Sequence, residues 1–189
     1  GFADVLVVPG DELIGTLNTS YTEVGMDETI VVTRSNKRAN VFNQGIRNTV
    51  LGREELLTTG DLLMVVKNNY YWTEKEKSSI GFLANGDRAR VMRVKNEQTA
   101  HGLSFADVWL QLSDYENEEL KVTIVLDSLL SEAPALTAQQ NEELYNNVLN
   151  DYADVLLKAD RMKMVKGDVF FNALQVKFAY AVTCHKAQG

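Results

Sequence analysis

Residues Gln175–Thr183, with the sequence QVKFAYAVT, decide the fold, because this apolar strand has no α/β partner close to it in the chain. Two other short apolar runs, Val5–Val8 and Ile30–Thr33, lie near the opposite end of the sequence. Strands that are buried on both faces of a parallel sheet are almost entirely apolar. The three runs therefore predict one sheet in which Val5–Val8, Ile30–Thr33 and Phe178–Val182 are neighbours.

The first third of the chain has the pattern of alternating strands and helices. Leu13, Ile14 and Leu17 recur at helical spacing within residues 11–24, and Ser35 can cap a second helix. Strand, helix, strand and helix in this order predict a parallel sheet with right-handed crossovers. The apolar stripe of the second helix is expected at Ala39, Phe42, Ile46 and Val50.

The middle of the chain changes to short strands that are separated by turn signals. Asn85-Gly86-Asp87 is a typical turn sequence, and residues 68–79 are expected to form an exposed hairpin loop. This pattern predicts a small antiparallel barrel. Four of its strands are expected at Asp61–Lys67, Arg90–Val94, Ala106–Leu112 and Leu120–Leu126.

A capping box at Thr137–Gln140 predicts a helix after these strands. Its apolar face is expected to carry Leu144, Val148, Tyr152 and Val155. The economical interpretation is an α/β fold with an inserted β-rich module. The expected division is residues 1–58 for the first part of the α/β domain, 59–170 for the barrel with its added helix, and 171–189 for the returning strand.

The composition is that of an ordinary globular protein. The 189 residues are 45% hydrophobic and 24% charged, which argues against disorder and against a coiled coil. No run approaches the about 18 consecutive apolar residues of a membrane helix, and no signal peptide is recognised, so no membrane partner is expected. Cys184 is the single cysteine, which excludes an intramolecular disulfide and favours a cytoplasmic location.

The charges are distributed unevenly along the sequence. The net charge of −7 argues against a free-standing nucleic-acid binder. However, residues 29–53 and 169–189 contain basic residues and no acid, whereas acids concentrate within residues 114–154. A fold that brings the two acid-free segments together would have a basic surface. The basic residues of the first segment are Arg34, Lys37, Arg38, Arg47 and Arg53.

Two runs of hydrogen-bond donors follow expected buried strands. Residues 183–189, TCHKAQG, supply hydroxyl, imidazole, ammonium and amide groups, and residues 33–38, TRSNKR, supply a guanidinium and the start of a helix. Ligands bind at the carboxyl ends of strands in open α/β sheets, and such donors suit phosphate oxygens. The alternatives are a polar loop for the first run and a capped helix with a solvated face for the second.

Together the two runs resemble motifs of a known family. VVTRSNKRANVFNQGIR at 31–47 is similar to motif IV, and AYAVTCHKAQG at 179–189 to motif V, of superfamily 1 DNA helicases of the RecD-like branch, which includes exonuclease V alpha subunits. Between them, GDLLMVVKNNY at 60–70 and FLANGDRARV at 82–91 resemble the opening of an SH3-like barrel. The barrel is inserted in the second RecA-like, P-loop NTPase-like domain of that family.

The resemblance implies an ATP-dependent DNA helicase with a role in DNA repair. Nucleotide-cleft positions would be Arg34, Gln188 and Gly189. Positions that contact single-stranded DNA would be Ser35, Asn36, Lys37, Thr183, His185 and Lys186.

The sequence contains no Gly-x-x-x-x-Gly-Lys-Ser/Thr phosphate loop, so the resemblance also implies a fragment. A first RecA-like domain of the same protein would supply that loop, and motif VI would follow Gly189. ATP and Mg²⁺ would be cofactors of the intact protein, and this chain is expected to bind neither by itself. No catalytic residue and no metal ligand is assigned within it.

Other residues leave alternatives open. His101 is expected to be incidental, and Tyr70, Tyr71 and Trp72 either stack on bases or supply barrel core plus one exposed ring. The acid-rich residues 114–154 favour a competing function, a non-catalytic acidic protein-interaction module.

Overall fold

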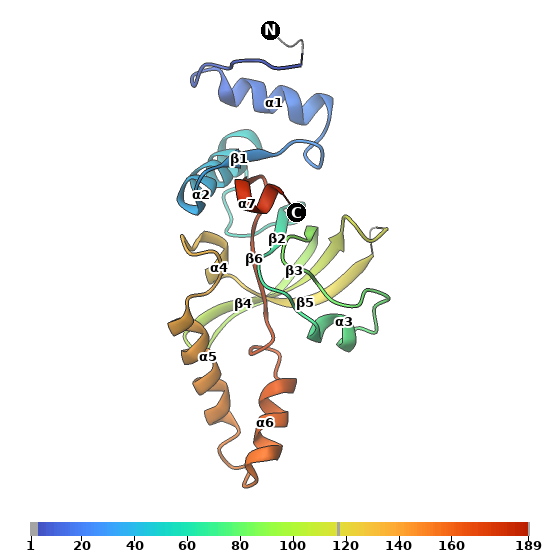
Figure 1. Ribbon diagram of the computed structural model, residues 1–189, viewed down its shortest axis with the longest axis vertical. Helices are drawn as coiled ribbons and strands as arrows, with labels where there is room; N and C mark the ends of the chain where they lie inside the picture. Colours follow the sequence, from blue (N-terminus) through green and yellow to red (C-terminus); the bar gives the residue numbers. More distant parts are fainter. Residues whose placement is uncertain (1–3, 117, 189) are drawn as a thin grey trace. The chain divides into compact units, whose positions relative to one another are not determined.

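The computed structural model describes residues 4–116 and 118–188, and these form two compact units (Figure 1). We call residues 57–179 the barrel unit, and residues 4–56 with 180–188 the α/β unit. The chain is thus a mixed α/β protein in which a β-rich unit interrupts an α/β unit, as the sequence predicts. No helix within the described residues has both the length and the apolar character needed to span a membrane.

The α/β unit contains a two-stranded parallel sheet. Strand β1 (Val31–Thr33) pairs with β7 (Ala181–Thr183), and Val32 lies opposite Val182. This pairing confirms the predicted neighbourhood for Ala181 and Val182 only, because Phe178, which is expected in the same strand, pairs with Leu63 of the barrel instead. The helices of the unit are α1 (Leu13–Glu23), α2 (Asn36–Gly45), the π-helix η1 (Ile46–Val50) and α7 (Cys184–Ala187).

The expected strand at Val5–Val8 is wrong. These residues are not assigned to a strand, and the side chain of Val7 is 96% exposed. In the described chain, β1 and β7 form a sheet of two strands that pair with each other. A strand requires a neighbour for its backbone N–H and C=O groups, so an apolar composition alone does not produce one.

The barrel unit contains a closed five-stranded barrel in the order β2-β3-β4-β5-β6. Adjacent strands are antiparallel, except that β5 and β6 are parallel. The side chains of β4 alternate between buried and half-buried, with Phe105 and Val108 fully buried in the barrel core. The strands are β2 (Leu62–Val65), β3 (Arg88–Ala100), β4 (Leu103–Leu112), β5 (Glu119–Val125) and β6 (Leu174–Phe178).

The single strand expected over Gln175–Thr183 is divided between the two sheets. In β6, Phe178 lies opposite Leu63 of the barrel, and the Ala179 N–H donates to the Leu62 oxygen at 2.9 Å. The Tyr180 oxygen instead accepts a hydrogen bond of 3.0 Å from the Val31 N–H of the α/β unit. Both halves of the run are buried, so hydrophobicity does not reveal where the partner changes.

Residues 68–79 do not form the expected exposed hairpin loop. They include helix α3 (Tyr71–Lys75), and Trp72 is buried, with its indole N–H donating to the Asn172 oxygen at 2.8 Å. Trp72 is therefore part of the barrel core, and Tyr70, which is 59% exposed, is an exposed ring of this aromatic group. The turn expected at Asn85-Gly86-Asp87 is confirmed, because Gly86 has φ +112° and the Asp87 carboxylate accepts from the Ala84 N–H at 2.7 Å.

Two helices of the insertion leave the barrel side by side, α5 (Ala138–Asp151) and α6 (Lys158–Gly167) (Figure 1). The capping box at Thr137 is confirmed. Leu144 and Val148 of α5 belong to the same buried cluster as Phe105, whereas Val155 lies beyond the end of the helix. A shorter helix, α4 (Asp127–Leu130), follows β5.

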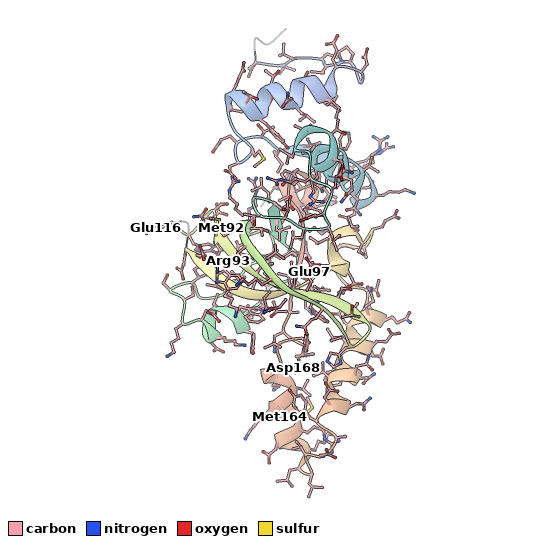
Figure 2. The ribbon with its side chains drawn as sticks, turned by 180° about the vertical axis from the view of Figure 1, so that it is seen from behind. Met92, Arg93, Glu97, Glu116, Met164 and Asp168 are labelled. Atoms are coloured by element: carbon pink, nitrogen blue, oxygen red, sulfur yellow. The ribbon has the colours of Figure 1, made fainter. Side chains whose placement is uncertain are left out.

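Helix α6, which the sequence pattern does not predict, returns the chain to the barrel at Asp168 (Figure 2). The Asp168 carboxylate accepts hydrogen bonds from the N–H groups of Phe170 and Phe171 at 2.8 and 3.0 Å. It also accepts one from the Tyr152 hydroxyl at 2.9 Å, and this bond raises the pKa of Tyr152. Asp168 therefore fixes the geometry of the chain where it leaves α6.

Candidate nucleic-acid interface

The two donor runs of the sequence follow adjacent strands of the α/β unit. Thr33, the last residue of β1, lies opposite Thr183, the last residue of β7, in the parallel register. Residues 34–37 and 184–188 therefore begin at the same edge of the sheet, although they are far apart in sequence. This is the edge at which ligands bind in open α/β sheets.

Asn43 of α2 holds β7 in this position. Its Nδ2 donates to the Ala181 oxygen at 2.9 Å, and its Oδ1 accepts from the Ala181 N–H at 2.7 Å. The side chain thus satisfies both backbone groups of one strand residue, and it is buried. The sequence pattern does not predict this role. Its signal in the sequence is that Asn43, a polar residue, lies on the helix face that carries Ala39 and Ile46.

Further contacts lie at the ends of the two strands, both between the strands and within the first run. The Thr33 hydroxyl lies 3.1 Å from the Ser35 oxygen and 3.3 Å from the Val182 oxygen. The Cys184 Sγ lies 3.3 Å from the Thr33 oxygen. Ser35 caps α2 as expected, since its Oγ accepts from the Arg38 N–H at 3.2 Å. The local backbone of both runs is therefore fixed by hydrogen bonds.

Most of the expected site residues present polar groups to solvent. Arg34, His185 and Gln188 are exposed, and among the described residues no hydrogen-bond or ion-pair partner occupies their side chains. Thr183 is half-buried at the N-cap of α7, where its side chain makes no capping hydrogen bond. The remaining positions are Asn36, which is half-buried, Lys37, which is exposed, and Gly189, which lies outside the described residues.

Lys186 differs from the other cations of the site because it is half-buried. Desolvation lowers its pKa below the ordinary lysine value. A partly desolvated ammonium group interacts more strongly with an anion than an exposed one, since water screens the interaction less. Lys186 is therefore the least solvated cation among the expected site residues.

Two of the expected basic residues are used within the fold, Arg47 fully buried and Arg53 half-buried. Arg47 is buried in η1, and its Nη2 donates to the Glu55 oxygen at 2.7 Å. Arg53 is half-buried, and its Nη1 donates to the Tyr180 hydroxyl at 2.5 Å. The basic surface is thus smaller than the sequence suggests, because buried guanidinium groups serve as multiple donors to the fold. Its exposed cations from the first segment are Arg34, Lys37 and Arg38.

The histidines do not form a metal centre. No cluster of three or more histidine, cysteine or acidic side chains suited to a metal ion occurs among residues 4–116 and 118–188. His101 lies at the β3–β4 turn, 3.5 Å from the Asp151 carboxylate, and its ring contacts Phe170 at a centroid distance of 5.3 Å. This environment is that of a structural residue.

The described residues at the edge of the sheet carry several hydrogen-bond donors. Such a set of donors can bind an anion such as phosphate. No family model matches the chain, and no curated protein matches it in sequence. The geometry of the edge therefore provides the basis for a functional proposal.

Proposed function

We propose that the chain is part of an ATP-dependent DNA helicase of superfamily 1, RecD-like branch. The α/β unit would be the larger part of the second RecA-like domain, and the barrel would be its SH3-like insertion. The intact protein would use ATP hydrolysis to move along single-stranded DNA. The first RecA-like domain of the same protein would be the partner of this chain.

One observation carries the proposal: the parallel register that places Thr33 opposite Thr183. Thr33 and Thr183 are the last strand residues within the two segments that resemble helicase motifs IV and V. A structure in which they lay in separate sheets would have removed the basis for a shared site. The interruption of the α/β unit by a barrel is the second supporting feature.

The donors at the edge have distinct proposed roles. Ser35, Asn36, Lys37, Thr183, His185 and Lys186 would contact the backbone of the DNA strand, and Arg34, Gln188 and Gly189 would line one wall of the ATP cleft. Positively charged and hydroxyl side chains position a nucleic acid through its phosphates without reading its sequence. The proposal therefore expects binding that is indifferent to base sequence.

The residues of this chain fit only part of an ATP site. Arg34 and Gln188 can donate to phosphate oxygens, but the sequence has no phosphate loop. ATP with Mg²⁺ supplies the free energy for movement in a helicase. Its phosphate cradle and metal ligands would come from the first RecA-like domain.

The test is a titration of labelled oligothymidine at several low salt concentrations. We expect weak binding, in or below the non-specific range of about 10⁻⁴–10⁻⁶ M, that falls steeply with salt because phosphate contacts release counterions. Replacing Arg34 and Lys186 together with alanine should weaken binding. The salt slope should then flatten by about one unit per lost contact.

A matched control removes two positive charges elsewhere. Lys158 and Lys163 on α6 are exposed, Lys163 by 82% of its side chain, so Lys158→Ala with Lys163→Ala preserves the charge change but leaves the edge intact. Equal affinity and equal salt slope for the two double variants would show that the edge does not contact DNA.

A non-catalytic protein-interaction module is the second candidate. Leu156 and Leu157, between α5 and α6, are 93% and 67% exposed, and Met164 on α6 is also exposed (Figure 2). Large exposed apolar patches mark interaction surfaces, and these side chains would belong to such a surface under this candidate. This candidate predicts that oligothymidine does not bind at any salt concentration, which separates it from the helicase proposal.

A further inference from the structure

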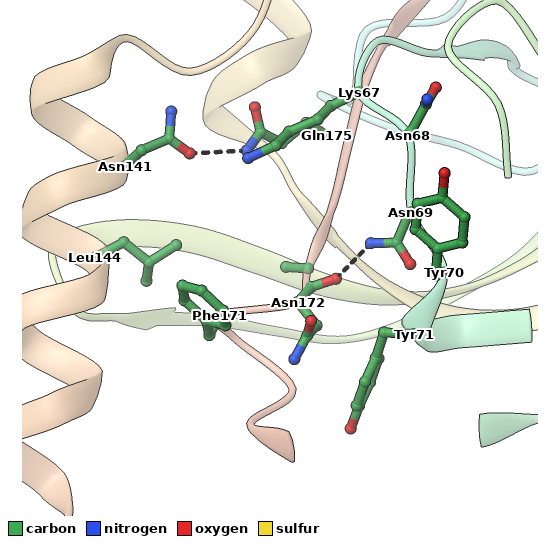
Figure 3. A pocket seen from close by; sticks show the side chains of 11 residues that line it. Lys67, Asn68, Asn69, Tyr70, Tyr71, Asn141, Leu144, Phe171, Asn172 and Gln175 are labelled. Carbon is green, nitrogen blue, oxygen red and sulfur yellow. Dashed lines mark hydrogen bonds between the residues drawn. The ribbon is translucent and has the colours of Figure 1, made fainter. Parts of the chain in front are cut away.

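A pocket of about 290 Å³ lies in the barrel unit (Figure 3). Its walls come from the loop after β2, from helix α5 and from the segment that leads into β6. The volume is near the lower limit of the range of about 300–1,000 Å³ that is usual for ligand sites. The pocket is therefore large enough for one small ligand.

Hydrogen bonds between its walls fix the shape of the pocket. Asn69 Nδ2 donates to the Asn172 oxygen, and Gln175 Nε2 donates to Asn141 Oδ1, each at 3.0 Å (Figure 3). Asn172 Nδ2 in turn donates to the Asp168 oxygen at 2.7 Å. A ligand would therefore enter a site whose amide groups are already ordered, which reduces the entropic cost of binding.

The charge of the pocket favours an anion. Lys67 is the one charged residue among its lining residues, and it extends from the end of β2 toward α5 (Figure 3). No carboxylate of the described chain pairs with it. Lys67 is exposed, and an exposed ammonium group without a carboxylate partner can donate charge-assisted hydrogen bonds to a phosphate.

The same loop after β2 also offers an aromatic platform. The Tyr70 ring stacks on Phe82 with a centroid distance of 4.8 Å and an interplanar angle of 22°, yet Tyr70 is 59% exposed. Phe82 thus supports one face of the ring and leaves area for a ligand. Asn68 Oδ1 accepts from the Asn85 N–H at 2.7 Å, whereas Asn68 Nδ2 donates to no described residue. Aromatic stacking and amide donors are the means by which proteins bind unpaired bases.

We propose that this pocket binds one nucleoside phosphate unit, with its phosphate at Lys67 and its base against Tyr70. The inference rests on the proposed function in one respect, since a DNA strand is the expected source of that unit. A free nucleotide is the other source with the same chemistry. All residues of this site belong to the barrel unit, so the site shares no residue with the donors of the α/β unit.

The experiment follows backbone amide NMR signals of the ¹⁵N-labelled 189-residue chain during titration with thymidine monophosphate, thymidine, inorganic phosphate and oligothymidine. We expect thymidine monophosphate to shift the signals of residues 67–71 and 171–173 more than thymidine or phosphate alone. Tyr70→Ala should weaken its binding about tenfold, within the range measured for loss of a stacked base. Lys67→Ala should weaken it about as much, because it removes a charge-assisted hydrogen bond to the phosphate. Tyr70→Phe should retain binding because it keeps the ring.

Oligothymidine distinguishes the two sources. Shifts of the same signals at lower concentration identify a strand, and shifts with the monophosphate alone identify a free nucleotide. Lys163→Ala is the matched control for Lys67→Ala and should change nothing. The proposal is overturned if the monophosphate leaves residues 67–71 and 171–173 unshifted, or if an aspartate- and glutamate-rich peptide shifts them and the nucleotide does not.

The failure of this proposal and that of the helicase proposal give different results. Strand-induced shifts confined to residues 34–37 and 183–188 would support the helicase edge and remove the pocket. Shifts confined to the pocket that persist in the Arg34→Ala, Lys186→Ala variant would support the pocket and remove the edge.

Discussion

Asn43 is the residue on which the shape of the candidate interface depends most. Its side chain makes two hydrogen bonds to the backbone of Ala181, both buried. We expect Asn43→Ala to destabilise the α/β unit by about 2 kcal/mol or more, because a buried backbone donor and acceptor lose their partners. Hydrogen exchange of the Ala181 amide, followed by NMR, measures the effect as faster exchange.

The control for this prediction is Asn48→Ala, which changes an exposed asparagine of η1. It should leave Ala181 protected. Equal exchange rates of the Ala181 amide in wild type and Asn43→Ala would contradict the role given to Asn43.

At the scale of elements, the start of α5 determines how firmly the insertion packs on the barrel. Thr137 and Gln140 form a reciprocal capping box, and α5 places Leu144 and Val148 in the cluster with Phe105. Thr137→Ala should lower the free energy of unfolding by about 0.5–2 kcal/mol, since it removes an acceptor for a helix N–H group. Urea unfolding monitored by the fluorescence of the two tryptophans measures the loss.

Asn146 is an exposed position in the interior of the same helix, so Asn146→Ala is a control of opposite sign. It should leave stability unchanged or raise it slightly, because alanine has the higher helix propensity. A loss in Asn146→Ala equal to that in Thr137→Ala would contradict the importance of the cap.

At the scale of the whole molecule, the chain carries donors for phosphate but lacks the phosphate loop of a nucleotide hydrolase. We therefore expect no ATP hydrolysis above background, with or without oligothymidine. Release of inorganic phosphate from ATP measures this, with an active P-loop ATPase as positive control. ATP hydrolysis that co-purifies with the chain, and that the Arg34→Ala, Lys186→Ala variant retains, would contradict this prediction. It would show that the chain has a nucleotide site away from these two residues.

Local sequence patterns determined the elements that depend on local interactions. Ser35 and Thr137 cap helices as predicted, and the Asn85-Gly86-Asp87 turn forms where expected, because caps and turns are made by residues a few positions apart. The candidate edge was also visible in the sequence, since both donor runs follow apolar strands. The change from the α/β pattern to the barrel was also visible in the sequence, because short strands separated by turn signals begin there.

Only the tertiary structure decided which apolar run pairs with which. Val5–Val8 and Gln175–Thr183 are similar in composition, but the first is exposed and the second is shared between two sheets. Likewise, Arg34 is exposed whereas Arg47 is buried, although both are arginines of one basic segment. Strand pairing and side-chain burial depend on neighbours that are distant in sequence. A local sequence pattern contains no information on the backbone groups or the packing of those neighbours.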